Sequence, residues 1–261
     1  MKLIKSTSEL QLMREGGERL AKIRDRLLEE LKVRAVPLQI DNLAKKLITE
    51  ADAIPSFMTV NNYQWATCIN INDMVVHGIP TQVPLEEGDV VGLDVGLIYK
   101  GYHTDTSWSA EVKSQSIRQA QDEKSKVKSE IETFLKIGEE ALNKAIKQAR
   151  PGNRIGHISK AIQETVESAG YSVVRSLVGH GVGKTLHEPP QVPGILTKPL
   201  DKTPELVPGM VLAIEVIYNM GGEQIVYKNE DGWTLVTADG SISGLFEHTV
   251  EIGKNSPIVL T

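Results

Sequence analysis

The chain has 261 residues, with 40% apolar and 24% charged side chains, which is ordinary for a soluble globular protein. Its net charge of −5 gives no electrostatic argument for binding a nucleic acid or an anionic membrane. No apolar run approaches the ~18 residues of a membrane span, and no signal peptide is recognisable. The single cysteine, Cys68, cannot form an internal disulfide, so we expect a cytoplasmic protein without nucleic-acid or membrane partners.

Two helices are expected at the start of the chain, followed by short strands. Ser6 and Glu9 form a capping-box pattern at the beginning of the first helix, which shows apolar residues at helical spacing. Pro37 is suited to the first turn of the second helix. Residues 66–71 and 75–77 then read as two short strands on either side of a turn.

Residues 88–109 read as a hairpin in which Asp94 falls on the face opposite to a row of apolar residues. A turn centred on Tyr99 and Lys100 predicts that Asp94 lies directly opposite Asp105. Like charges in that position are destabilising, so two carboxylates there need a shared proton or a cation. The glycines beside Asp94 are expected to leave room for that cation. The alternative is that both aspartates are surface residues flanking a turn.

The second half of the chain repeats the order of helices and then strands. Helices are expected at residues 116–148 and 158–169, and a strand at 171–178 leads into a glycine-rich segment and a proline-rich loop. The remaining strands are predicted at residues 210–218, 223–226, 233–236 and 245–252. This order predicts an α+β protein whose two similar halves meet near residue 125.

Three further residues have the chemistry of metal ligands. Glu215 interrupts an apolar strand and Glu247 lies in another, and a buried carboxylate without a partner is energetically costly. His180 lies between two glycines, which would let it approach a metal. For each residue alone, a lysine-paired carboxylate or a histidine in a turn is the alternative. One histidine with four carboxylates suits two closely spaced divalent ions better than a structural zinc.

The segments that carry these residues resemble type I methionine aminopeptidases in their order and spacing. They are VVHGIP with His77, LDVGLIYKGYHTDTS with Asp94 and Asp105, GHGVGKTLHEPPQV with His180 and His187, GMVLAIE with Glu215, and FEHTV with Glu247. The resemblance implies a pita-bread fold with a central antiparallel sheet and outer helices. It implies a single catalytic domain of residues 1–261, with pseudo-symmetric halves of about 1–125 and 126–261.

The resemblance also implies two divalent cations, Co, Mn, Fe or Zn, and a ligand set. By the family pattern Asp94 chelates one metal, His180 and Glu215 hold the other, and Asp105 and Glu247 bridge both. A metal-bridged water or hydroxide would attack the first peptide bond, since a bound cation lowers the pKa of water.

Three residues have catalytic roles in this family pattern. Glu215 is expected to accept and transfer the proton of the attacking water. His77 and His187 resemble the two histidines that contact the substrate and stabilise the tetrahedral intermediate. For each histidine the alternative is a hydrogen-bonded structural side chain.

The family's methionine pocket is apolar, and it is matched here by Tyr63, Cys68 and Trp233, with Trp65 and Phe57 nearby. Cys68 as a plain buried cysteine is the alternative. Some positions depart from the family pattern without removing a ligand. Leu186 replaces an aromatic residue before the second histidine, so the pocket is expected to be less selective, and Pro189 and Val216 also differ.

The implied function is removal of the initiator methionine from nascent polypeptide N-termini, with preference for a small uncharged second residue. The chain resembles the compact bacterial form, without an N-terminal zinc-binding extension. We expect a monomer, and transient contact with the ribosome is left open.

Two alternatives remain at this stage. One is an Xaa-Pro or other aminopeptidase on the same fold, and the other is a non-catalytic pita-bread binding protein. The absence of a large N-terminal domain argues against the first, and the filled ligand positions argue against the second.

Overall fold

The computed structural model describes residues 3–113, 123–228 and 230–261, with backbone only at 123–129. Among the described residues the helices are α1 (Thr7–Leu28), α2 (Pro37–Glu50), α3 (Glu123–Gln148) and α4 (Ile155–Ser168). None of them is long and apolar enough to cross a membrane. The start of the third predicted helix, at 116, lies outside the described residues, and α4 begins three residues earlier than predicted.

The first two helices begin where their sequence signals predict. Ser6 accepts a hydrogen bond from the backbone of Glu9, while the Glu9 side chain accepts one from the Ser6 backbone, so the capping box is confirmed. A cap of this kind is worth about 1 kcal/mol. Pro37 occupies the first position of α2.

Every strand pair within the described ranges is antiparallel, and most belong to one large sheet. Its central path runs in the order β1 (Ile54–Pro55), β4 (Val90–Tyr99), β5 (Tyr102–Glu111), β12 (Ser243–Ile252), β9 (Val211–Asn219), β7 (Val178–Gly181) and β8 (Glu188–Pro193). Beside this path, β2 (Thr67–Ile71) pairs with β4, β6 (Ser172–Val173) with β9, and β13 (Pro257–Val259) with β12. A smaller sheet joins β10 (Ile225–Tyr227), β11 (Leu235–Thr237) and β3 (Met74–Val76).

The predicted α+β class is confirmed, although the short strands β1 and β13 were not predicted and two other regions differ in detail. The strand predicted at 171–178 is divided into β6 and the start of β7. The proline-rich loop contains β8, which the sequence did not predict because proline cannot donate to a strand ladder. Such a strand is tolerated at the edge of a sheet, and β8 ends the central path.

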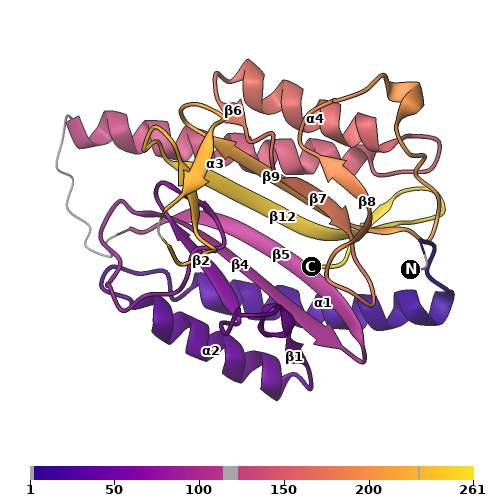
Figure 1. Ribbon diagram of the computed structural model, residues 1–261, viewed down its shortest axis with the longest axis horizontal. Helices are drawn as coiled ribbons and strands as arrows, with labels where there is room; N and C mark the ends of the chain where they lie inside the picture. The colour runs from indigo at the N-terminus through magenta and orange to yellow at the C-terminus, as the bar shows by residue number, and fades with distance from the viewer. Residues whose placement is uncertain (1–2, 114–122, 229) are drawn as a thin grey trace.

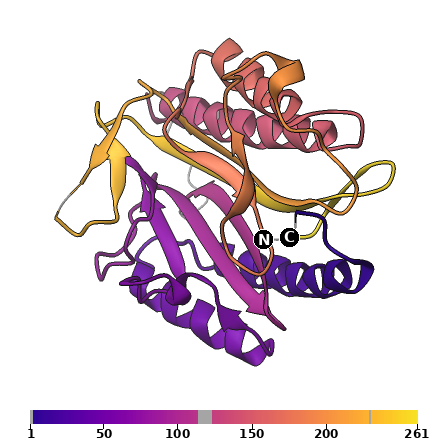
Figure 2. The same cartoon turned by 45° about the vertical axis from the view of Figure 1, so that its right-hand side comes forward.

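The helices form two pairs, each packed on a different part of the sheet (Figures 1 and 2). In one core, α1 and α2 bury Leu20 and Ile40 against Leu93 and Leu97 of β4. In the other core, α3 and α4 pack on every second residue of β9 and on β12. The helices contribute Phe134 and Ile158, β9 contributes Leu212, Ile214 and Val216, and β12 contributes Phe246. Burial of side chains of this size is worth roughly 1.5–3 kcal/mol each.

This packing assigns the other face of the sheet to polar residues. Side chains alternate between the two faces of a strand, so residues next to the packed positions point away from the helices. Asp94 follows Leu93, Glu215 lies between Ile214 and Val216, and Glu247 follows Phe246. The helices therefore leave a carboxylate-bearing face uncovered.

Candidate active site

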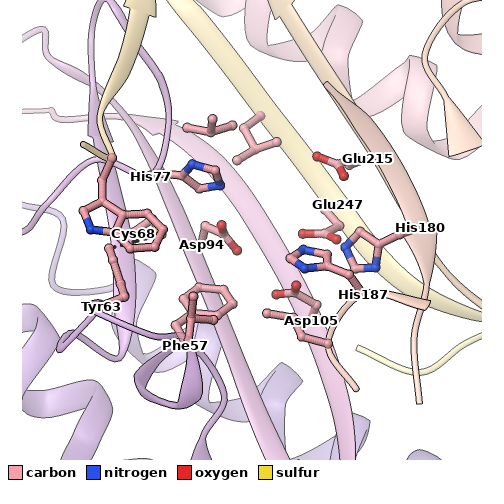
Figure 3. A pocket seen from close by; sticks show the side chains of 15 residues that line it. Phe57, Tyr63, Cys68, His77, Asp94, Asp105, His180, His187, Glu215 and Glu247 are labelled. Carbon is pink, nitrogen blue, oxygen red and sulfur yellow. Dashed lines mark hydrogen bonds between the residues drawn. The ribbon is translucent and has the colours of Figure 1, made fainter. Parts of the chain in front are cut away.

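A cavity of about 170 Å³ lies on this uncovered face (Figure 3). Its lining includes all of the predicted metal-binding residues, both predicted substrate histidines, and the apolar residues Tyr63, Cys68, Leu186 and Trp233. These residues come from strands and loops throughout the chain. Figure 3 shows the labelled carboxylates and histidines converging on one region, with Tyr63, Cys68 and Phe57 beside it.

The predicted register of the central hairpin was wrong by two residues. Asp94 pairs with Ser107, and Asp105 pairs with Gly96, so the aspartates are diagonal rather than directly opposite. The turn is formed by Lys100 and Gly101, both with positive φ (48° and 85°). This is the pattern of a type I′ hairpin, in which glycine favours the second turn position. Because the error is an even number, both aspartates still lie on the same face.

The structure also corrects the role of the glycines beside Asp94. A Cβ at Gly96 would lie 3.0 Å from the Phe57 ring and from Ser56 Cβ. The missing side chain thus admits Phe57, not a cation. The glycines beside His180 likewise admit backbone, since a Cβ at Gly179 would meet the carbonyl oxygen of Ala213 at 2.5 Å.

Strand pairing places three of the carboxylates in one row across the sheet. Asp94 pairs with Ser107, Ser107 with Glu247, and Glu247 with Glu215. Neighbouring strands lie ~4.8 Å apart, so each member is close to the next. Glu215 and Glu247 are directly opposite each other, which is the destabilising arrangement that the sequence predicted for the two aspartates.

A second row lies two residues further along each strand. Asp105 is bound to Thr249, whose hydroxyl accepts from the Asp105 N–H at 2.9 Å and donates to its carbonyl at 2.8 Å. Thr249 pairs with Ala213, and Ala213 pairs with His180. Asp105 and His180 thus reach the same region as the first row, although 75 residues separate them in the chain.

The carboxyl groups resist ionisation together. Burial raises the pKa of Asp105 to about 7, and burial together with the Asp105 charge raises that of Glu215 to about 8. The pKa values of Asp94 and Glu247 are raised well above their ordinary range by burial and by the neighbouring carboxylates. Such a group of acids calls for positive charge.

His180 is prepared to act as a ligand. Its Nδ1 lies 2.9 Å from the carbonyl oxygen of Gly181, which can only accept, so Nδ1 carries the proton and Nε2 keeps its lone pair. Burial, and then the neighbouring His187, lower the pKa of His180 to about 4, so the ring is neutral at pH 7.

The donor set fits a divalent metal. Asp105, His180 and Glu247 each offer one ligand atom, and these atoms lie within 4.8 Å of one another. Asp94 Oδ1 is buried and has no hydrogen-bond partner in the described part of the chain, which is costly unless a cation or proton satisfies it. Oxygen donors with one imidazole are typical ligands of Mn, Fe, Co and Zn.

Two more histidines border the cavity. His77 directly follows β3 and adopts a left-handed backbone (φ 57°), a conformation that costs about 1–3 kcal/mol and is often found at functional sites. The His187 ring lies 4.3 Å from the His180 ring. Burial lowers the pKa of both His77 and His187, and His187 lowers that of His77 further, so both rings are neutral near pH 7.

The apolar part of the cavity is built around Tyr63. Its hydroxyl lies 2.9 Å from the Thr67 carbonyl and 3.2 Å from Cys68 Sγ, and its ring meets Trp233 edge-on at 5.1 Å. Burial raises the pKa of the Cys68 thiol, so it is neutral. Trp65 packs edge-on against Tyr63 at 5.3 Å but does not line the cavity.

Sequence reasoning did not assign several residues of the site. Val60, Val76 and Leu245 line the cavity, as does Phe57, which the sequence placed only nearby. Ser107 stands between Asp94 and Glu247 in the first row, and its buried hydroxyl has no hydrogen-bond partner among the described residues. Its period-two position after Asp105 was the available signal.

The fold and the site define a metal-dependent peptidase. A family model described as metallopeptidase family M24 matches residues 11–254, and the chain belongs to this family. It is 39% identical to methionine aminopeptidase 1 of Bacillus subtilis over an alignment of 261 residues. The alignment covers 100% of this chain and 99% of that protein. The chain is also 36% identical to the methionine aminopeptidase of Aquifex aeolicus, over 98% of this chain and 97% of that protein.

Solved structures agree with the predicted pita-bread fold. The crystal structure of the Thermotoga maritima methionine aminopeptidase matches with a TM-score of 0.90 and 36% identity, over 100% of this chain and 99% of that one. A prolidase from Pyrococcus furiosus matches with a TM-score of 0.74 and 23% identity, over 99% of this chain and 65% of that one, which shows the fold alone. The sequence-based prediction of a metallo-hydrolase of the methionine aminopeptidase type is confirmed.

Proposed function

We propose that this protein removes the initiator methionine from nascent polypeptides and prefers a small uncharged second residue. The observation that supports this most strongly is the cavity itself, which combines a group of buried acids with an apolar recess. The acids supply a hydrolytic centre, and the recess suits an uncharged, flexible thioether side chain. The named relatives over the full chain point to the same activity.

Two divalent cations are the proposed cofactors, chosen among Co, Mn, Fe and Zn. In this proposal Asp94 would hold one cation, His180 and Glu215 would hold the other, and Asp105 and Glu247 would contribute to both. When bound, they would polarise the peptide carbonyl and lower the pKa of a water molecule.

The remaining steps belong to the side chains. Glu215 receives the proton of the attacking water and returns it to the leaving amine. His77 and His187 donate hydrogen bonds to the developing oxyanion and to the substrate backbone. One such donor typically contributes ~10²- to 10³-fold to the rate. Tyr63, Cys68, Leu186 and Trp233 enclose the methionine side chain, and Trp65 supports Tyr63 from behind.

We further propose that residues 1–261 act as a single catalytic domain with pseudo-symmetric halves of about 1–125 and 126–261. The two helix pairs, one packed on each part of the sheet, support this division. Initiator methionine is removed where proteins are made, so we propose action in the cytoplasm, as a monomer that meets the ribosome only transiently.

Release of free methionine from a Met-Ala-Ser peptide tests this function. The protein is stripped of metal and then supplied with Mn, Co, Fe or Zn in turn, with Xaa-Pro and Leu-Ala-Ser peptides as controls. Metal-dependent cleavage of the methionine peptide alone is expected. Cleavage of the proline peptide instead would indicate a related peptidase, and the absence of cleavage with every metal would exclude catalysis.

A further inference from the structure

The loop that presents His187 is held by a buried ion pair from the start of the chain. Lys5 Nζ donates to Glu188 Oε2 at 2.7 Å, and these side chains are only 5% and 4% exposed. Glu188 directly follows His187 at the beginning of β8. The Lys5 N–H donates to the Gly209 carbonyl at 2.8 Å, which fixes the N-terminal segment beside the sheet. Figure 2 shows this segment close to the β7–β8 connection.

His187 depends on its neighbours for its position. Residues 182–187 form no helix or strand, and part of His187 remains exposed, whereas Leu186 and Glu188 on either side are buried. The Glu188 carboxylate also accepts a hydrogen bond from the Thr185 N–H at 3.2 Å. The carboxylate therefore spans the second half of the loop, and the flanking residues place the imidazole, whose ring meets His180 edge-on at 4.3 Å.

The first half of the loop is wound against the same ion pair. A Cβ at Gly183 would lie 2.7 Å from Lys5 Cε and 2.8 Å from Glu188 Oε1. The Gly183 carbonyl accepts a hydrogen bond from the His103 N–H at 2.7 Å, which joins the loop to β5. The loop backbone thus encloses the ion pair, and its shape depends on both charges remaining in place.

Buried ion pairs are weak contributors to net stability, because desolvation of the two charges opposes their attraction. The presence of such a pair is easier to explain where it holds the surrounding backbone in one conformation. We infer that Lys5 is a positioning residue: acting through Glu188, it fixes the loop that aims the His187 imidazole into the cavity. This inference rests on the proposed function, in which His187 contacts the substrate.

The test compares Lys5→Met and Lys5→Arg with the wild type in the metal-loaded, full-length protein. Methionine keeps the apolar stem without the charge, and arginine restores the charge. Because a misplacement of ~1 Å in a catalytic group can cost ~100-fold, we expect Lys5→Met to lower kcat by about 10- to 100-fold. Metal content should change little, because neither Lys5 nor Glu188 is in the proposed ligand set. The loss should appear more in kcat than in KM, because a hydrogen bond to the developing oxyanion forms only in the transition state. Lys5→Arg should restore most of kcat.

A double-mutant cycle with His187→Ala identifies the route of the effect. If Lys5 acts through His187, adding Lys5→Met to His187→Ala lowers kcat no further. Arg14→Met is the matched control, because it breaks another ion pair between the N-terminal region and the sheet, Arg14 Nη2 to Glu251 Oε1 at 2.7 Å. That variant should lose stability but keep kcat.

Wild-type kcat in Lys5→Met would overturn the inference, and so would independent, multiplying effects of Lys5→Met and His187→Ala. If Lys5→Met does not fold, Gly183→Ala replaces it, since it keeps both charges and displaces the pair. NMR of the His187 ring protons, assigned by their loss in His187→Ala, gives a readout without turnover. Unchanged His187 signals in Lys5→Met would overturn the inference, whereas a wild type that releases no methionine would overturn only the proposed function.

Discussion

Glu215 and Glu247 lie directly opposite each other on β9 and β12, whereas Asp94 and Asp105 on β4 and β5 are offset by two residues. Like charges on directly opposite residues destabilise a sheet, and here the pair is buried. The protein therefore carries electrostatic strain at the cavity. A bound cation relieves that strain, so metal content is the first property that the ligand variants should change.

Asp105→Ala is expected to lose most of the bound metal and activity. Asp105 supplies one of three candidate ligand atoms that lie within 4.8 Å of one another, so its loss should exceed the ~10- to 100-fold effect typical of residues outside a ligand shell. Metal content by elemental analysis and methionine release measure the outcome. Asp73 is half-buried, pairs with Lys228 and does not line the cavity, and it supplies the control, Asp73→Ala. Full activity in Asp105→Ala would show that the hairpin is not the site.

His77→Ala should keep its metal and lose turnover. The His77 ring lines the cavity but is not in the proposed ligand set, and loss of a transition-state hydrogen-bond donor typically lowers kcat by ~10²- to 10³-fold. Steady-state kinetics and metal analysis of the same sample test this. His157→Ala, in α4, is the control for loss of a histidine. Loss of metal from His77→Ala would show that His77 helps to hold the metal and is not only a substrate contact.

Leu186→Phe should sharpen the preference for methionine over leucine. Leu186 is buried beside Tyr63 and Cys68, and a larger ring there would reduce the space available to a branched side chain. Differences of one methylene in an apolar pocket change kcat/KM by ~10- to 200-fold, so a rise of about tenfold in the Met/Leu ratio is expected. The exposed Val83 gives the control, Val83→Phe. An unchanged ratio would remove Leu186 from the specificity pocket.

Glu188→Gln should destabilise the protein in a pH-dependent way. Burial alone would raise the pKa of Glu188, but hydrogen bonds from Lys5 and from the backbone of Thr185 and Lys184 outweigh it and lower that pKa. A carboxyl with a lowered folded-state pKa stabilises the fold above its unfolded pKa, about 4.3, and loses this effect as the pH falls through the folded value.

Urea unfolding of wild type and Glu188→Gln at several pH values checks the sign. The difference in unfolding free energy should be largest near neutral pH and shrink as the pH falls below about 4. A difference that stays constant down to the acid limit of folding would show that the carboxylate charge is not what stabilises the loop.

Local chemistry made much of this protein predictable. The Ser6 cap, the Pro37 helix start and the strand positions of Glu215 and Glu247 follow from residue types and short periods. The hairpin register was predicted wrongly, although the sequence held a signal for the correct one. Lys100 and Gly101 fit a two-residue turn better than Tyr99 and Lys100, because glycine favours the second turn position.

The sequence by itself determined which residues have metal-binding chemistry, and strand alternation determined that the carboxylates of each strand face away from the helices. Only the tertiary structure decided that β5, β12 and β9 are neighbours, and therefore that Asp105, Glu247 and Glu215 meet. It alone brought Lys5 to Glu188, 183 residues away. Periodicity and caps act over a few residues, whereas these contacts arise from burial of two separate cores, which no short segment encodes.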